Sequence, residues 1–192
     1  MNGLVVRMNM RQVAKSMLLG VFLWSIGMGA QAAAPVCDAA HTEQIRRSTD
    51  TSDLNLKCSL TLSADVILSR RVVIEGEESS DVVLDCVGGM IVAPEAEPYS
   101  LLIQSRRNAD GTWSVPQHVQ VKNCTILGGT RIVGMGINGQ AEVVRQSSLT
   151  VGHTERAQAA APAYTELDNM TFQGRGTIPL YIAPGVTHTV VR

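Results

Sequence analysis

Apolar and polar residues alternate along short segments through the middle of the chain. The longest such run is LNLKCSLTL at 54–62, in which nearly every second residue is apolar. Similar segments end at Gly76 and at the Gly88-Gly89 pair, and others centre on 101–103 and 119–121. Alternation over about 4–6 residues, bounded by Gly, Asp and Asn, is typical of half-buried strands. Because no sustained helical period crosses this region, the pattern predicts an all-β domain.

An internal repeat adds a spatial expectation to these strands. The segment VKNCTILG at 121–128 returns as LDNMTFQG at 167–174. A further step of about 23 residues from Leu167 reaches Val190, so one unit of about 23 residues accounts for both spacings. A chain that winds into a coil and completes one turn of the coil per unit needs such a period, whereas a meander of hairpins does not. We therefore expect strands stacked in register, with apolar residues as ladders in the interior.

Asn123 and Asn169 occupy equivalent positions in the two copies, and each begins an N-x-T triplet. This triplet is also the acceptor pattern for N-glycosylation. Asn tolerates a positive φ and bonds neighbouring backbone groups. We interpret both residues as structural turn residues of the repeat.

Residues 131–163, between the two copies, lack the strand pattern. The segment begins Gly-rich and then contains two candidate helical turns, at 141–146 and at 155–161. Thr154 is placed as the N-cap of the second turn, and Pro162 follows its end. We expect an inserted segment that leaves the stacked strands and returns. A shorter loop is expected at 106–117.

The first 32 residues read as a secretory signal peptide. Three basic residues precede an apolar run at 17–29, and Ala30-Gln31-Ala32 has the small-x-small form of a cleavage site. The alternative is a membrane anchor, for which a run of about 13 residues is short. Residues 33–53 then form an N-terminal lead-in with a short helix at 39–47.

Composition and charge narrow the class of protein. Hydrophobic residues make up 45% of the chain, which argues against whole-chain disorder. The net charge is −1. Without the leader, 13 basic residues face 17 acidic residues, which gives −4. A mildly acidic protein does not suit nucleic acid or anionic membranes, so neither is an expected partner. No segment after the leader is apolar enough to span a bilayer.

All four cysteines, Cys37, Cys58, Cys86 and Cys124, follow the leader. An even number in an oxidising compartment predicts disulfides. We favour a bond between Cys37 and Cys58, which closes a loop of about 20 residues and stabilises the fold by about 3 kcal/mol. Cys86 then pairs with Cys124. The alternative leaves the second pair as buried thiols. Stacking arguments do not settle the pairing, because the two later cysteines differ in parity when the apolar positions are aligned.

Several segments together resemble a known family. The stretch LKCSLTLSADVILSRRVVIEGEESSDVVLDCVGGMIV at 56–92 is similar to the opening circuits of a right-handed parallel β-helix of the pectate-lyase-like superfamily. Within it, VVLDCVGG resembles a turn common in bacterial secreted members, and VQVKNCTILGG at 119–129 resembles their Asn-containing circuit. The resemblance covers 54–135 and 164–192. The alternative fold is a β-sandwich with the same alternation.

The resemblance implies a β-helix of few circuits over 54–192. The repeat resumes at Thr187 and stops at Arg192, where the aligned position is Asn. We therefore expect a C-terminally partial member of the family. The alternative is a small β-helix whose last circuit is covered by a partner.

The resemblance also implies a function connected with polysaccharide. No catalytic set is recognisable: the histidines are scattered and no G-x-S-x-G occurs. Neither a metal nor a cofactor is expected. After the leader, 11 Arg accompany only two Lys, and the planar guanidinium suits carboxylates. An anionic-sugar site is therefore predicted in the inserted segment, at Arg131, Asn138, Arg145, His153 and Arg156.

The alternative for these five residues is a solvated surface. Trp113, in the 106–117 loop, either stacks on a sugar ring or covers the side of the stacked strands. The sequence thus predicts a periplasmic or secreted protein that binds or modifies polysaccharide as a lyase, epimerase or hydrolase. The alternative is a non-catalytic scaffold or surface-interaction protein. An anionic polysaccharide is the expected partner.

Overall fold

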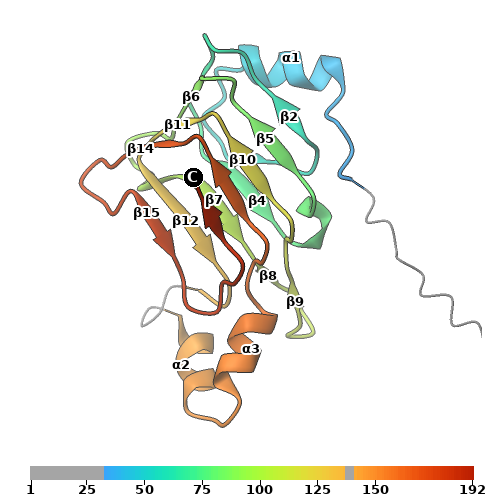
Figure 1. The fold of residues 1–192 in the computed structure, drawn as a ribbon, viewed down its shortest axis with the longest axis vertical. Coiled ribbons are helices and arrows are strands. Elements are labelled where there is room, and N and C mark those ends of the chain that lie inside the picture. The colour runs from blue at the N-terminus through green and yellow to red at the C-terminus, as the bar shows by residue number, and fades with distance from the viewer. Residues whose placement is uncertain (1–32, 137–140) are drawn as a thin grey trace, which may run out of the picture. The chain divides into compact units, whose positions relative to one another are not determined.

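The strands of the chain follow one another around three parallel sheets (Figure 1), in the computed structural model, which describes residues 33–136 and 141–192. The first sheet contains β1 (Leu54–Asn55), β4 (Val72–Glu75), β7 (Tyr99–Gln104), β12 (Gly129–Val133) and β15 (Leu180–Ile182). The middle sheet contains β2 (Leu60–Thr61), β5 (Val83–Asp85), β10 (Gln120–Lys122), β13 (Glu166–Asp168) and β16 (Val190–Val191). The third contains β3 (Ile67–Leu68), β6 (Met90–Val92), β11 (Thr125–Leu127) and β14 (Thr171–Gln173).

One passage through the three sheets is called a circuit below. Every strand in these sheets pairs in parallel with its counterpart in a neighbouring circuit. The chain is thus mostly β, with several parallel sheets, as the alternating pattern predicts.

The core lies between the sheets and consists of apolar ladders. Along the middle sheet, Leu60, Leu84, Val121 and Leu167 are in register and at most 1% exposed. Along the third sheet, Ile126 lies between Ile91 and Phe172. Neighbouring parallel strands lie less than about 5 Å apart, so their equivalent side chains are in contact. The apolar residue of each circuit therefore packs on that of the circuit before it.

The circuits are not of one length, so a fixed unit of about 23 residues is wrong. Successive partners in the middle sheet are Leu60, Leu84, Val121, Leu167 and Val191, separated by 24, 37, 46 and 24 residues. The 46-residue step is one circuit carrying the inserted segment. The last register also differs by one residue from the expected one, since Leu167 pairs with Val191 and not with Val190.

The N-terminal lead-in contains α1 (Ala39–Arg47), the helix that the sequence predicts. Its N-cap is Asp38, whose side chain accepts a hydrogen bond from the backbone N–H of His41 (2.7 Å). Arg46 and Arg47 lie in the last turn, where positive charges interact favourably with the helix dipole and stabilise the helix. Ile45 is buried against the strands and fastens the helix to the core.

Both expected disulfides are present. Cys37 is bonded to Cys58, and Cys86 to Cys124. The interpretation of the second pair as free thiols is therefore wrong. The first bond ties the lead-in to the first circuit. The second joins two successive circuits at the corner between the middle and third sheets.

That corner also carries the repeated asparagines. Asn123 and Asn169 have φ values of 55° and 50°, as their role as turn residues predicts. Asn169 Nδ2 donates to Asn123 Oδ1 (2.8 Å), and Asn123 Nδ2 donates to Asp85 Oδ1 (2.9 Å). Partial burial raises the pKa of the Asp85 carboxyl. The hydrogen bonds from Asn123 and from the Val87 N–H, together with the nearby Lys122 charge, outweigh this effect, so the pKa is lowered. The side chains therefore form a ladder that parallels the backbone pairing.

The inserted segment is helical but begins later than the sequence indicates. Arg131 belongs to β12, and α2 (Glu142–Ser148) and α3 (His153–Ala159) follow. Thr154 lies inside α3 and is not its N-cap, a position held by Gly152 in the left-handed conformation (φ 78°). The 106–117 loop contains an antiparallel hairpin of β8 (Arg106–Arg107) and β9 (Trp113–Ser114).

Two expectations fall outside the described residues: the signal peptide at 1–32 and the site residue Asn138. Among the helices that the structure describes, none combines the length and the apolar character needed to cross a bilayer.

Replacing Ile126 by Asp tests the ladder. Ile126 is 0% exposed, so the substitution buries an unpaired carboxyl group between Ile91 and Phe172. We expect the free energy of unfolding to fall by several kcal/mol, about 3 or more, and the melting temperature to fall with it. Gln173→Asp, at an exposed position of β14, is the control. Equal melting temperatures for the two variants would contradict the inward assignment.

Candidate functional site

Three elaborations of the chain lie at the same corner, between the first and middle sheets. They are the short 3₁₀ helix η1 (Glu77–Ser79) after β4, the β8–β9 hairpin after β7, and the pair α2–α3 after β12. Because β4, β7 and β12 are neighbours in the first sheet, insertions that follow them are stacked in the same order. Figure 1 shows the hairpin and the two helices together at the lower end of the molecule.

The hairpin is fastened to the circuit before it. Arg106 forms an ion pair with Glu78 of η1, and the backbone N–H of Glu77 donates to Ser114 Oγ (2.8 Å). At the tip, Asp110 Oδ1 accepts from the Thr112 N–H (2.9 Å), and Gly111 supplies the positive φ of the turn. These contacts hold both strands of the hairpin against the sheet.

Glu78 is the most strongly perturbed carboxyl group of this corner. The hydrogen bond from Arg106 lowers the pKa of Glu78 to about 2, helped by Lys57 at 3.3 Å and opposed by partial burial. The same pair raises the pKa of Arg106. Both groups therefore stay charged at neutral pH.

The helices are held by close backbone approaches and by one arginine. A Cβ on Gly134 would lie 2.8 Å from the carbonyl oxygen of Ala160, so the chain just after β12 passes directly against the end of α3. Arg156 donates to the carbonyl oxygens of Ser147 (2.9 Å) and Val151 (2.7 Å). These bonds connect α3 to the end of α2 and to the link between the two helices.

Between the hairpin and the helices lies a cavity of about 590 Å³, here called the Trp113 cavity. Its walls come from the hairpin, from the chain after β12 and from both helices. The lining residues are Arg107, Gly111, Trp113, Met135, Val143, Gln146, Ser147, Arg156, Ala159 and Ala160. The volume lies in the range of small-molecule sites, about 300–1,000 Å³.

The chemistry of the cavity combines one indole, apolar walls and two guanidinium groups. Trp113 is half-buried, and Arg107 is exposed at the rim. The Arg156 guanidinium is engaged with the end of α2, so Arg107 is the cation with more freedom to contact a ligand. Of the described residues that line the cavity, none is acidic. The arrangement suits a ring-shaped, hydroxylated or anionic ligand.

Of the four proposed site residues that the structure describes, it brings His153 and Arg156 together and places Arg131 and Arg145 elsewhere. Arg156 lines the Trp113 cavity, and His153 Nδ1 lies 3.0 Å from Ser147 Oγ behind it. Arg145 is exposed and is paired with Glu142, outside the lining. Asn138 lies outside the described residues.

Arg131 is buried in β12 and is separate from the cavity. Its Nη1 donates to the carbonyl oxygens of Thr130 and Ile178 (2.8 Å each), and its guanidinium carbon lies 4.4 Å from the centroid of the Tyr99 ring. The backbone carbonyls and the aromatic ring account for this arginine, so its position is that of a structural residue.

The sequence interpretation missed Arg107, Met135 and Gln146. The sequence did contain a signal for this cavity. The 106–117 loop and the inserted segment each interrupt the repeat after equivalent strands of the first sheet, β7 and β12. Aligning the circuits would have placed Trp113 beside the helices. That alignment needs the register, which the unequal circuit lengths conceal.

A second groove, of about 570 Å³, runs along the middle sheet. Beside it stack the rings of His118, Tyr164 and His188, with centroids 4.7 and 4.4 Å apart. All three have φ near 55°. The two histidine rings each stack on Tyr164, which lies between them, whereas Trp113 takes part in no such stack among the described residues.

Comparison with protein-family models, with curated proteins and with solved structures finds no match.

The Glu78 pair gives a prediction on pH dependence. Because the folded pKa of Glu78 is lowered from 4.5 to about 2, its stabilisation is complete above pH 4.5 and is lost as the pH falls towards 2. The melting temperature of wild type should exceed that of Glu78→Gln at pH 7, and the difference should shrink across this window. Glu95→Gln, at an exposed position, is the control. A difference that stays constant down to pH 2 would rule out this ion pair.

Proposed function

We propose that this protein is an exported carbohydrate-binding protein built on a right-handed parallel β-helix of the pectate-lyase-like kind, with the Trp113 cavity as its binding site. The rotation of the chain through three parallel sheets supports the fold. Crossovers between parallel strands are right-handed in almost all proteins, which supports the hand.

The observation that carries the function is the half-buried Trp113 in a cavity of about 590 Å³, next to Arg107. Large aromatic rings offer an apolar face while their polar edge stays hydrated. The face of a sugar ring is apolar and its rim is hydroxylated, so the two surfaces are complementary. Gln146 and Ser147 add polar groups that bind hydroxyls.

An anionic sugar suits the cavity better than a neutral one. Arg107 presents a planar fork that matches a carboxylate. A uronic acid or a sulfated sugar would bring its negative charge to this rim, where the described lining holds no acid to repel it.

Binding fits the cavity better than catalysis. Glycoside hydrolysis needs two carboxyl groups about 5–10 Å apart, and proton abstraction needs a positioned base. The described lining of the Trp113 cavity supplies Ser147 but no carboxylate and no histidine. We therefore propose ligand binding, and not catalysis, as the function of this cavity.

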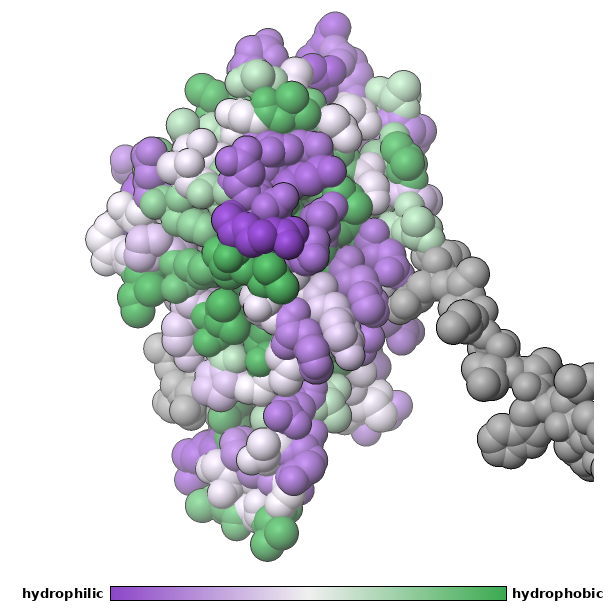
Figure 2. Space-filling model, in the orientation of Figure 1, coloured by the Kyte–Doolittle hydropathy of each residue, from purple (hydrophilic) through white to green (hydrophobic). Residues whose placement is uncertain are grey.

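A non-catalytic scaffold is the second candidate, and one observation favours it. On the outer face of the middle sheet, Lys122 lies in register between Asp85 and Asp168, so charges of alternating sign line the surface. Figure 2 shows hydrophilic and apolar residues interspersed over the visible face. Such a surface also suits protein partners.

Export is supported by the two disulfides, which persist in oxidising compartments. A periplasmic or extracellular location agrees with the proposed glycan ligand, since polysaccharides abound at cell surfaces.

The first test is Trp113→Ala, with binding measured by calorimetry against a panel of neutral and uronate oligosaccharides. Loss of the indole should weaken binding by about tenfold or more, which corresponds to about 1.4 kcal/mol. Tyr164→Ala, an exposed aromatic residue of the other groove, is the matched control. Unchanged binding by Trp113→Ala, or loss only in the control, would refute the site.

The second test separates two arginines. Arg107→Gln should weaken uronate binding by about tenfold and leave neutral ligands unaffected. Arg145→Gln removes an exposed arginine that lies outside the cavity lining and should leave both unaffected. The opposite result, with only Arg145→Gln weakened, would favour the residues proposed from the sequence.

A further inference from the structure

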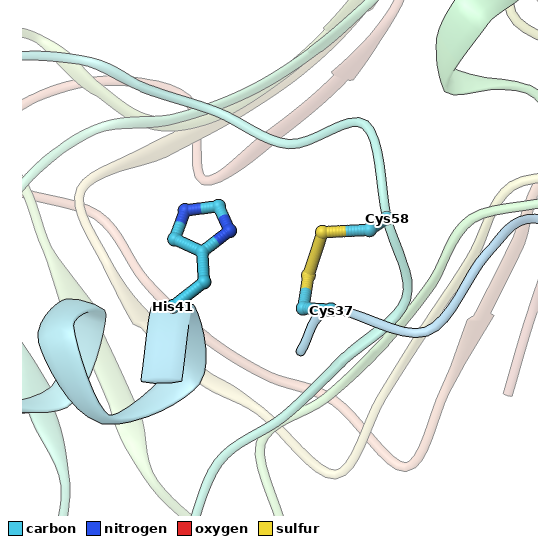
Figure 3. A group of neighbouring side chains, drawn as sticks. All are labelled: Cys37, His41 and Cys58. Atoms are coloured by element: carbon cyan, nitrogen blue, oxygen red, sulfur yellow. A yellow bond between two sulfur atoms is a disulfide. The ribbon is translucent and has the colours of Figure 1, made fainter. Parts of the chain in front are cut away.

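The lead-in disulfide has a histidine beside it. Cys37, Cys58 and His41 lie together where α1 begins (Figure 3). One ligand atom from each, the two sulfurs and a ring nitrogen, lie within 4.8 Å of one another. Cys58 is half-buried and His41 is exposed, so solvent and small reagents reach the group.

Backbone contacts hold these residues together independently of the S–S bond. The N–H of Cys37 donates to the carbonyl oxygen of Ser59 (2.9 Å), and the N–H of Ser59 donates to that of Pro35 (2.7 Å). His41 is fixed by the Asp38 cap, and Ile45 anchors the helix in the core. The two cysteines and the histidine should therefore stay adjacent if the covalent bond is opened.

We propose that this group is a redox-gated metal site. Attack by an external dithiol on the disulfide yields the Cys37 and Cys58 thiols, while the dithiol is oxidised to its own disulfide. Binding of Zn²⁺ then displaces the two thiol protons to solvent and joins two thiolates and the His41 imidazole to one ion. In the oxidised protein the sulfurs are bonded to each other, and the site does not exist.

The spacing suits a tetrahedral metal ion. Zinc–sulfur bonds of about 2.3 Å and zinc–nitrogen bonds of about 2.0 Å place the ligand atoms of one tetrahedron about 3.5–3.8 Å apart. The three ligand atoms already lie within 4.8 Å of one another. Once the S–S bond is broken, rotations of the side chains are therefore enough to reach that geometry. Three protein ligands leave the fourth position for water or another ligand.

The second disulfide provides an internal contrast. Cys86 and Cys124 are 0% and 2% exposed, whereas Cys58 is half-buried. Access of the attacking thiolate governs exchange. Mild reduction should therefore open Cys37–Cys58 before Cys86–Cys124. The site is distinct from the Trp113 cavity, and this inference does not depend on carbohydrate binding.

The test is to treat the folded full chain with limiting dithiothreitol, remove the reagent without oxygen, and titrate with Co²⁺ and then Zn²⁺. Alkylation and peptide mapping should label Cys37 and Cys58 first. We expect one Co²⁺ per chain, a thiolate-to-cobalt absorption band, and displacement of the band by Zn²⁺. Untreated protein should give no band.

His41→Ala should weaken Co²⁺ affinity of the reduced protein by about tenfold or more, and His188→Ala, far along the chain, should not. Circular dichroism of the reduced protein should match that of the oxidised form. Absence of the band, equal affinity in His41→Ala, earlier labelling of Cys86 and Cys124, or loss of the folded spectrum on reduction would each overturn the proposal.

Discussion

Backbone pairing between successive circuits is the constraint on which the rest of this structure depends. Each strand donates to and accepts from its counterpart one circuit away, so equivalent residues must stand in register. An apolar residue at an inward position then requires an apolar residue above and below it, as along Leu84, Val121 and Leu167. Differences between circuits are consequently restricted to the corners, where the chain leaves one sheet for the next.

The two corners that flank the middle sheet satisfy this constraint differently. At the corner between the middle and third sheets, positive φ values fall on Val87, Asn123 and Asn169, and the amides of the two asparagines bond to one another. At the corner between the first and middle sheets, they fall on Asp81, His118, Tyr164 and His188, and the rings of the last three stack on one another. Side-chain ladders thus reinforce the backbone register on both edges of the sheet.

The corner between the first and middle sheets is where the chain departs most from regular stacking, and it is also where chemistry collects. Glu78 comes from one circuit, Arg106 and Trp113 come from the next, and the helices come from the circuit after that. Because β4, β7 and β12 are neighbours in the first sheet, the loops that follow them lie side by side, and contacts such as the Arg106–Glu78 ion pair join them. The proposed carbohydrate site uses this property, because the hairpin supplies Trp113 and Arg107 while α2 and α3 supply the other walls.

The sequence by itself determined the features that depend on neighbours along the chain. Alternation at 54–62 predicts strands, the segment 39–47 predicts α1, and Asn123 and Asn169 predict left-handed turns. The residues that meet across circuits were decided only by the tertiary structure. The sequence places Arg131 in the inserted segment, whereas the structure buries it on β12, and nothing in the sequence singles out Arg107, which borders the Trp113 cavity. The physical reason is register: loops of unequal length between strands leave the local pattern intact but change which residues are stacked, and only hydrogen bonding between strands far apart in sequence determines that.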